Sequence, residues 1–200
     1  VGSEMCIRDR SLDERAVVTG GGVGVSVTAG CLMNSEGVLS SGMTTSHGIG
    51  LQVTLDNDGE LTSSYQGQSS RSKLPEVPAC VSRAVHWAQV TQNPLRLDSD
   101  AHDAPVLLTS EGFSPLFSMV VPPAMTGEKM VRNESFWSEK MNTQVINPSL
   151  SIHDDGLLEG GMSSGSRDGE GVPRRQQALV EDGRLTSMLW STRDAAQQVA

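Results

Sequence analysis

The sequence predicts an α+β fold: an antiparallel β meander covered by a helix, followed by a second, mixed β-rich domain with short helices. Residues 23–28 and 49–56 carry apolar side chains at every second position, which is the period of a half-buried strand. Both patterns lead into turn-forming strings, at residues 34–37 and 56–59. A helical pattern comes after these strands, so the first part of the chain combines a sheet with a helix.

The first domain is expected over residues 11–99. A return strand through Leu61 and Tyr65 follows the second turn and completes the meander, with one face of the sheet in solvent. The next apolar residues fall on one face of a helix, which we expect to cover the sheet: Val77, Val81, Ala84, Val85 and Ala88. Asn93 and Pro94 should end this helix because proline cannot continue it.

The second domain is expected over residues 100–200, after the acidic stretch 98–103, which has little to bury. Its elements are predicted as a strand at 105–109, a helical run at 114–121 ended by Pro122 and Pro123, strands at 151–153 and 177–180, a hairpin turn at 181–183 with a return strand to 190, and a helix start at 192. Residues 160–171 are rich in glycine and serine, and we expect either a mobile linker or a functional loop.

Residues 1–10 resemble the translation of a sequencing adapter, so we expect a non-native tail that takes no part in the fold. A gene cut at Ser11 would lack its natural beginning. The helical pattern from residue 192 to residue 200 also stops without a glycine cap or a polar tail. We therefore expect the chain to be a fragment of a longer protein.

Charge and composition exclude several classes of protein. The chain has 15 basic and 24 acidic residues, a net charge of -9, and no basic cluster longer than Arg174–Arg175, which argues against a nucleic-acid reader. No run of roughly 18 apolar residues exists to span a membrane. Cys6, Cys31 and Cys80 have neither zinc-ribbon spacing nor an even number, so a reducing, cytoplasmic location fits best.

Two glycine-rich strings invite functional interpretations that their contexts do not favour. Residues 20–24 resemble a phosphate loop, but they lack the Lys-Ser/Thr pair and precede a strand instead of a helix. Residues 161–165 place Ser163 in a nucleophile-elbow string, but no helix follows it and no histidine lies downstream. The simpler interpretations are a flexible strand start and a chance match. The four histidines also lack the spacing typical of a metal site.

The string His153-Asp154-Asp155, at the end of a predicted strand, is the more informative polar cluster. Two adjacent carboxylates at the mouth of a site would bind a cation or an amine. The alternative is a solvated turn before Gly156.

Five ordered elements of the second domain resemble the TldD/PmbA family: a strand ending in Asp154-Asp155, a glycine pair at Gly160-Gly161, the string from Asp168 to Pro173, a hairpin at Gly183, and a helix start at residues 192–195. Residues 34–37, Arg71 and the helix to Trp87 are similar to the family's central domain. The resemblance covers residues 11–200, and it implies that the family's N-terminal domain and C-terminal end are absent.

This resemblance implies a cytoplasmic proteolytic system of two related subunits, a heterodimer acting on unfolded peptides. In such a system one subunit holds zinc on a helix that contains His and Glu, and zinc polarises the peptide carbonyl. Residues 114–126 correspond to that helix and contain neither His nor an acid. The chain is therefore similar to the PmbA (TldE) type of subunit, with no cofactor of its own, zinc in a TldD-type partner, and no nucleic-acid or membrane partner.

The resemblance gives five candidates for the substrate groove or its loop, and no catalytic residue or metal ligand: Asp154, Asp155, Asp168, Glu170 and Gly171. Two other functions stay open. The chain would be a zinc-dependent peptidase in its own right if Asp154, Asp155 or Glu170 held a metal together with residues of the absent part. It would be a peptide-binding module without a proteolytic role if the loop at residues 160–171 bound peptides alone.

Overall fold

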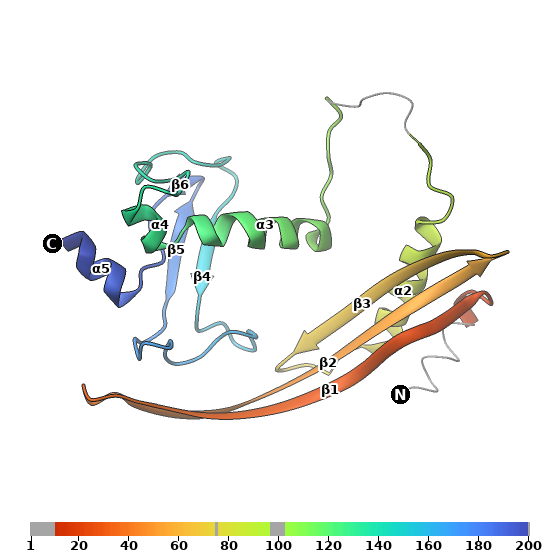
Figure 1. Ribbon diagram of the computed structural model, residues 1–200, viewed down its shortest axis with the longest axis horizontal. Coiled ribbons are helices and arrows are strands. Elements are labelled where there is room, and N and C mark those ends of the chain that lie inside the picture. Colours follow the sequence, from red (N-terminus) through yellow and green to blue (C-terminus); the bar gives the residue numbers. More distant parts are fainter. Residues whose placement is uncertain (1–10, 75, 97–102, 200) are drawn as a thin grey trace. The chain divides into compact units, whose positions relative to one another are not determined.

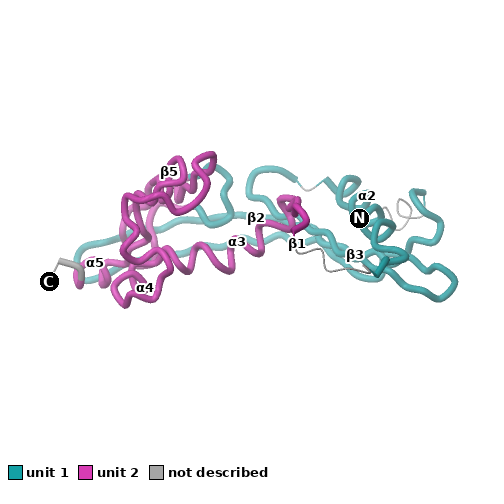
Figure 2. The backbone as a smooth tube through the Cα atoms, turned by 90° about the horizontal axis from the view of Figure 1, so that it is seen from above, with its two compact units in different colours: residues 1–99, 158–164 teal, residues 100–157, 165–200 magenta. Residues whose placement is uncertain are grey.

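The computed structural model describes residues 11–74, 76–96 and 103–199, and it confirms the predicted α+β class. The expected tail at residues 1–10 and most of the acidic stretch at 98–103 lie outside this range. The chain divides into two compact units (Figure 2). Unit 1 comprises residues 1–99 and 158–164, and unit 2 comprises residues 100–157 and 165–200. Part of the glycine- and serine-rich loop thus belongs to each unit.

Unit 1 contains a three-stranded antiparallel sheet in the order β1-β2-β3, formed by β1 (Ala16–Met33), β2 (Leu39–Asn57) and β3 (Glu60–Ser70) (Figure 1). Both predicted turns are confirmed. The Asn34 side chain accepts hydrogen bonds from the backbone N–H groups of Glu36 and Val38, both at 3.0 Å. The Asp56 carboxylate accepts one from Gly59 N–H at 2.8 Å. Asn and Asp side chains that satisfy local N–H groups in this way stabilise reversals of the chain.

One face of this sheet is covered by α2 (Val77–Val90), as the helical pattern predicts. Leu51, Val53 and Leu55 of β2 are fully buried against a row of smaller residues on the helix. That row consists of Cys80, Val81, Ala84, Val85 and Ala88. Small side chains let the helix approach the sheet closely, so the larger residues of β2 fill the core between them.

The hairpin of β1 and β2 extends beyond the third strand. β3 pairs with β2 only from His47 to Asn57, whereas β1 and β2 stay paired as far as Met33 and Leu39. Residues 26–46 therefore form a two-stranded antiparallel structure, which we call the ribbon.

The glycine-rich string at residues 20–24 lies inside β1, next to a register irregularity between Val18 and Gly20. Gly21 has a φ of +148°, and a Cβ at this position would lie 2.6 Å from the carbonyl oxygen of Gly50. Glycine is needed here because β1 and β2 approach each other too closely for a side chain. The string is thus part of a strand.

Unit 2 contains a second antiparallel sheet in the order β4-β5-β6. Its elements are α3 (Ser110–Ala124), α4 (Gly127–Val131), β4 (Ile152–Asp155), β5 (Gln176–Glu181), β6 (Arg184–Leu185) and α5 (Thr192–Val199). Its core is built from Met125, Trp137, Leu179, Val180, Leu185 and Met188. None of the helices in the described part of the chain is both long enough and apolar enough to cross a membrane.

Three predictions for unit 2 were wrong in detail. Residues 105–109 form no strand, and α3 begins at Ser110 because the Thr109 side chain accepts a hydrogen bond from Gly112 N–H at 3.2 Å and caps the helix. The helix then continues through the expected stop at residues 122–123 to Ala124. The return strand of the hairpin ends at residue 185, well short of residue 190. Its regular pairing stops there because the N–H groups of Thr186 and Ser187 both donate to the carbonyl of Leu179 in β5, at 2.9 and 3.2 Å.

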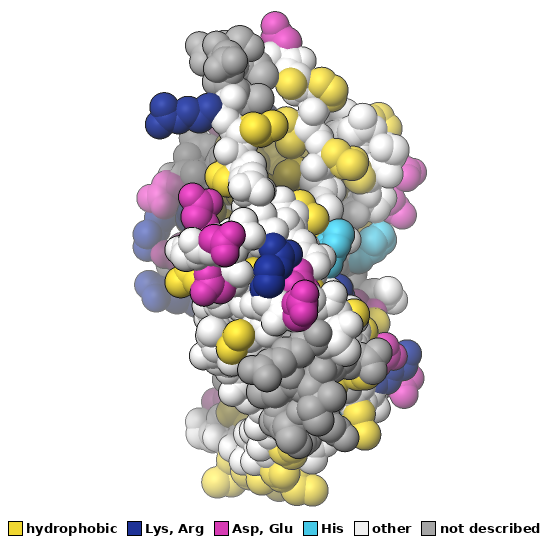
Figure 3. Space-filling model, turned by 90° about the vertical axis from the view of Figure 1, so that its right-hand side faces the viewer, with side chains coloured by type: hydrophobic (Ala, Val, Ile, Leu, Met, Phe, Trp, Pro, Cys, Tyr) yellow, Lys and Arg dark blue, Asp and Glu magenta, His cyan; other side chains and the backbone are white. Residues whose placement is uncertain are grey.

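Charges of both signs are interspersed on the surface. On the face shown in Figure 3, lysine and arginine side chains lie beside aspartate and glutamate side chains.

Candidate functional site

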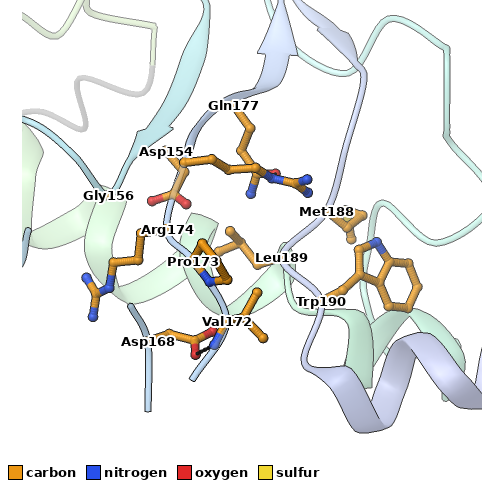
Figure 4. Close-up of a pocket in the computed structure, with 11 residues that line it drawn as sticks. Asp154, Gly156, Asp168, Val172, Pro173, Arg174, Gln177, Met188, Leu189 and Trp190 are labelled. Carbon is orange, nitrogen blue, oxygen red and sulfur yellow. Dashed lines mark hydrogen bonds between the residues drawn. The ribbon is translucent and has the colours of Figure 1, made fainter. Parts of the chain in front are cut away.

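The candidate site in unit 2 is a cavity of about 330 Å³ beside the pair of strands β4 and β5. Asp154 of β4 lies directly opposite Gln177 of β5, and both line the cavity (Figure 4). Asp168 reaches it from the glycine- and serine-rich loop. The wall is completed by Gly156, Val172, Pro173, Arg174, Arg175, Met188, Leu189 and Trp190. Two acids, two arginines and an apolar wall therefore meet in one place.

The loop carrying Asp168 is held in a fixed shape by its own hydrogen bonds. The Asp168 carboxylate accepts from the backbone N–H groups of Glu170 and Val172, both at 2.9 Å; the bond to Val172 is dashed in Figure 4. Asp168 N–H also donates to the Val172 carbonyl at 3.0 Å. Arg167 Nη1 donates to the carbonyl of the buried Gly171 at 2.6 Å. This part of the loop is therefore an ordered turn.

Glu170 belongs to the loop and does not line the cavity; instead, its side chain contacts the first residue of α5. Its carboxylate accepts a hydrogen bond from Thr192 N–H at 3.0 Å. Ser191 caps the same helix: its Oγ accepts from Asp194 N–H at 3.1 Å and donates to the Asp194 carboxylate at 2.6 Å. A negative charge is favourable at a helix N-terminus, so Glu170 joins the loop to α5.

The two adjacent acids at the end of β4 are separated by the strand itself. Successive side chains of a strand point to opposite faces, so Asp154 lines the cavity and Asp155 does not. The Asp155 carboxylate accepts a hydrogen bond from Leu157 N–H at 3.0 Å, which stabilises the turn after the strand. Asp155 therefore matches the alternative of a turn residue. Of the five predicted residues, only Asp154 and Asp168 line the cavity.

An apolar groove of about 580 Å³ lies between α3 and β4. It is lined by Leu108, Phe113, Leu116, Phe117, Val121, Trp137, Ile146, Leu150, Ser151, Ile152 and His153. The rings of Phe113 and Phe117 contact each other, with centroids 5.6 Å apart. His153 lines the groove whereas Asp154 lines the cavity, so β4 borders both hollows.

The groove was missed by the sequence analysis, which considered only polar residues as site candidates. One signal was present: Phe113, Leu116 and Phe117 are spaced so that they share one face of a helix. Their exposure has to be seen in the structure, where Phe113 and Leu116 are each 49% exposed although they are large and apolar.

The described residues do not fit a zinc ion. Zinc is held by Cys, His, Asp or Glu side chains that converge. From residue 114 to residue 126, α3 and the segment after it offer only Ser, Pro, Leu, Phe, Met, Val, Ala and Thr. Over residues 11–74, 76–96 and 103–199, no three potential ligands lie close enough together to hold a metal ion.

Comparison with known proteins relates both units to one family. Residues 101–199 match the family model described as the PmbA/TldA metallopeptidase C-terminal domain. The protein MJ0231 of Methanocaldococcus jannaschii is 27% identical over 192 residues, covering 96% of this chain and 44% of that protein. In Haemophilus influenzae, the metalloprotease TldD homolog is 28% identical and the metalloprotease PmbA homolog 26% identical, each over 162 residues.

These two matches cover 77% and 78% of this chain, and 34% of each Haemophilus protein. The crystal structure of TldE from Thermococcus kodakarensis shares the fold, with a TM-score of 0.83 at 22% identity over 98% of this chain and 44% of that chain. The chain thus spans less than half the length of the relatives it matches. Residues 101–199 thus match the C-terminal domain of the TldD/PmbA family, and the chain as a whole is similar to members of that family.

Proposed function

We propose that this chain is part of the subunit that does not bind zinc in a cytoplasmic TldD/PmbA-type metallopeptidase, and that it helps to form the groove for an unfolded peptide. The partner would be a related TldD-type subunit that supplies the zinc ion. The observation that carries the proposal is the composition of residues 114–126, which begin within α3 and end just after it. Where the family resemblance places a zinc-binding helix, this chain has only aliphatic, aromatic, hydroxyl and proline side chains.

The apolar groove beside β4 supports a role in peptide binding. β4 is the edge strand of its sheet, so an extended peptide could pair with its backbone groups. The side chains of such a peptide would then enter the groove and meet Phe113, Leu116 and Phe117. Unfolded chains expose apolar side chains, and these are the groups that the groove would remove from water.

The cavity on the other side of β4 supports binding of charged peptide groups. Asp154 offers an exposed carboxylate, for which the described residues provide no hydrogen-bond partner. Arg175 is the other exposed charged residue of the wall, and its Nε donates to Gln177 at 3.2 Å. Acids suit peptide amino groups and arginines suit carboxylates, so a peptide lying along β4 would find partners for both charges.

The experiment is to produce the chain together with a zinc-bearing TldD-type subunit and to measure complex formation and cleavage of an unfolded peptide. The test variant is Phe113→Lys, which places a charge in the apolar groove. Its matched control is Met119→Lys on the same helix, where the side chain is 69% exposed and does not line the groove. The test variant should raise the KM for peptide about tenfold or more, and the control should leave it unchanged.

Failure to form a complex with any zinc-bearing relative would contradict the partner role. Equal effects of the two lysine variants would contradict the groove. If the isolated chain bound zinc stoichiometrically and cleaved peptide, the alternative of a peptidase in its own right would replace this proposal.

A further inference from the structure

Arg71 holds a backbone carbonyl group far along the chain. Its Nη1 donates a hydrogen bond to the carbonyl oxygen of Ser164, 93 residues away, at 2.8 Å, and this bond is partly buried. Both residues belong to unit 1, because residues 158–164 are grouped with it although they lie between β4 and β5 in the sequence. Hydrogen bonds from a charged donor are stronger than those between neutral groups. The bond is therefore a candidate anchor for this segment.

The turn that carries Arg71 is fixed to the sheet of unit 1. Ser70, the last residue of β3, pairs with His47 of β2. The Oγ of Ser70 accepts hydrogen bonds from the backbone N–H groups of Ser72 and Lys73, at 3.1 and 2.9 Å. His47 Nε2 also donates to the carbonyl oxygen of Lys73. The guanidinium of Arg71 therefore extends from a rigid support.

Residues 158–164, which we call the loop tip, lie against the same turn. Gly160 has a φ of +71°, and a Cβ at this position would lie 2.9 Å from the Oγ of Ser72. At Gly161 a Cβ would overlap the side-chain oxygen of Ser164. The glycine pair is thus needed so that the loop tip can fold on itself and approach the turn.

Apolar burial contributes little to the position of the loop tip. Leu158 and Met162 are its large apolar residues, and they are 57% and 48% exposed. Its internal bonds run from Gly161 N–H to the Leu158 carbonyl at 3.0 Å and from Ser164 N–H to the Gly161 carbonyl at 3.1 Å. These bonds shape the loop tip but do not attach it to the turn. Segments with few buried apolar contacts open easily, so a polar anchor has a large effect on them.

The two ends of the loop tip lead into the wall of the cavity in unit 2. Gly165 N–H donates to the carbonyl of Gly156 at 3.0 Å, and Gly156 N–H donates to the carbonyl of Arg175 at 3.2 Å. Arg174 N–H donates to the carbonyl of Ser166 at 3.1 Å. Gly156, Arg174 and Arg175 all line the cavity (Figure 4). These bonds form the stem of the loop, and the stem is part of the wall.

We infer that Arg71 is a positioning residue for the cavity. Ser164, whose carbonyl it holds, directly precedes Gly165 of the stem, so the bond fixes the point at which this part of the wall begins. The inference rests on the proposed function, in which the cavity binds charged groups of a peptide. A site that is complete for only a fraction of the time binds its ligand more weakly by that fraction.

The first test is amide hydrogen exchange, resolved to single residues by NMR. Arg71→Ala should speed exchange of the Gly165 and Arg174 N–H groups about tenfold or more, which is the effect of losing one hydrogen bond from a charged donor. Both amides are bonded within the stem and not to Arg71. Lys73→Ala is the matched control, because it removes an exposed positive charge from the same turn and keeps the Arg71 bond. Its exchange rates should equal those of the wild-type chain.

The second measurement is the KM and kcat of the complex with a zinc-bearing TldD-type subunit, for an unfolded peptide. Arg71→Ala should raise KM at least about threefold and leave kcat unchanged, because peptide would bind only when the wall is complete. Arg71→Lys keeps the charge but not the planar group, so its KM should lie between those of wild type and Arg71→Ala. A purely structural role would lower the unfolding midpoint and leave KM unchanged. Lys73→Ala should match the wild type.

A second variant disturbs the same contact from the loop tip. Gly160→Ala would place a Cβ 2.9 Å from the Oγ of Ser72, and it should change both exchange and KM in the same direction as Arg71→Ala. Gly37→Ala is its control, because φ there is +84° and no atom would lie within 4 Å of the Cβ. This pair decides the question if Arg71→Ala does not fold.

Wild-type exchange at Gly165 and Arg174 in both Arg71→Ala and Gly160→Ala would overturn the inference. Faster exchange with an unchanged KM would also overturn it, since the stem would then move without any effect on binding. If the wild-type complex did not bind peptide, the proposed function would fail, whereas the exchange rates would still decide whether Arg71 holds the stem in place.

Discussion

The carboxylate of Glu170 accepts a hydrogen bond from Thr192 N–H at 3.0 Å and thereby fixes the loop before β5 to the first turn of α5. The acid that the family resemblance singles out as a loop candidate therefore has a structural partner. This bond separates the candidate acids into two groups: those that hold the loop and the helix, and those that face the cavity.

Replacing Glu170 should lower stability more than it lowers binding. Glu170→Ala removes both the acceptor and the negative charge at the helix N-terminus, and should reduce the free energy of unfolding by about 1 kcal/mol. Glu170→Gln keeps an acceptor and should lose only about half as much. Denaturant unfolding measures both. Glu159→Gln, an exposed acid in the same loop region, is the control and should have no effect; equal losses in all variants would contradict the assignment.

Asp154 and Asp168 both line the cavity, but we expect Asp154 to act in peptide binding and Asp168 to stabilise the loop. Asp154→Asn removes an exposed charge and should raise the KM of the complex for peptide about tenfold without changing the unfolding midpoint. Asp168→Ala removes the acceptor for two backbone N–H groups and should cost about 1–2 kcal/mol of stability. Asp168→Asn, which keeps the acceptor, is the control. A loss of stability in Asp154→Asn would show that its role is structural.

The hairpin turn after β5 should tolerate only glycine at residue 183. Gly183 has a φ of +75°, and a Cβ there would lie 2.5 Å from the carbonyl oxygen of Ile146 and 2.8 Å from that of Asn147. Gly183→Ala should therefore destabilise unit 2 by about 3 kcal/mol or more, since both strain and overlap contribute. Gly59→Ala is the matched control, with a φ of +93° but open space around the position, and should cost only about 1 kcal/mol.

Thermal unfolding of the two variants checks this difference. Similar midpoints would mean that the backbone conformation, and not the contact with residues 146–147, sets the cost.

Asp13 should make the stability of unit 1 depend on pH. The hydrogen bond from the Arg15 guanidinium, with a further one from the Gln89 amide, holds the pKa of this carboxyl well below its usual range. A lowered folded-state pKa stabilises the fold above the unfolded value of about 3.9, and this contribution is lost as pH falls below it. Wild-type protein should thus exceed Asp13→Asn in melting temperature at pH 7, and the gap should close toward pH 2.

Asp58→Asn is the control for this series. It lies in a turn with a φ of +52°, a conformation that Asn also adopts, and its midpoint should track the wild-type midpoint at every pH. A gap between wild type and Asp13→Asn that is independent of pH would show that the effect of residue 13 is not electrostatic.

The sequence predicts the local features of this fold well because their causes are local. Asn34 and Asp56 bond to N–H groups two to four residues away, so both turns can be recognised from short strings. The α2 face follows from a period that the helix itself imposes. By contrast, the start of α3 depends on one cap at Thr109. The apolar residues just before this cap have the pattern of a strand, so the sequence predicts a strand where none forms.

The candidate site was predictable only in part, because its geometry joins distant segments. Asp154 and Asp155 were expected to act together, but the alternation of a strand separates neighbours that the sequence places side by side. Glu170 finds its partner at Thr192, 22 residues away. The apolar groove needs α3 and β4 to come together, and no local pattern states which helix a strand will face.

Gly21 lies where the backbones of β1 and β2 approach each other most closely for a described glycine of β1. At this position in the hairpin of β1 and β2, the carbonyl oxygen of Gly50 leaves no room for a Cβ atom on residue 21. The close approach of β1 and β2 at this point therefore depends on the absence of a side chain at residue 21. A methyl group at residue 21 would force β1 and β2 apart, whereas Gly24, Gly30 and Gly42, farther along the hairpin, have open space around them and could be replaced without such a clash.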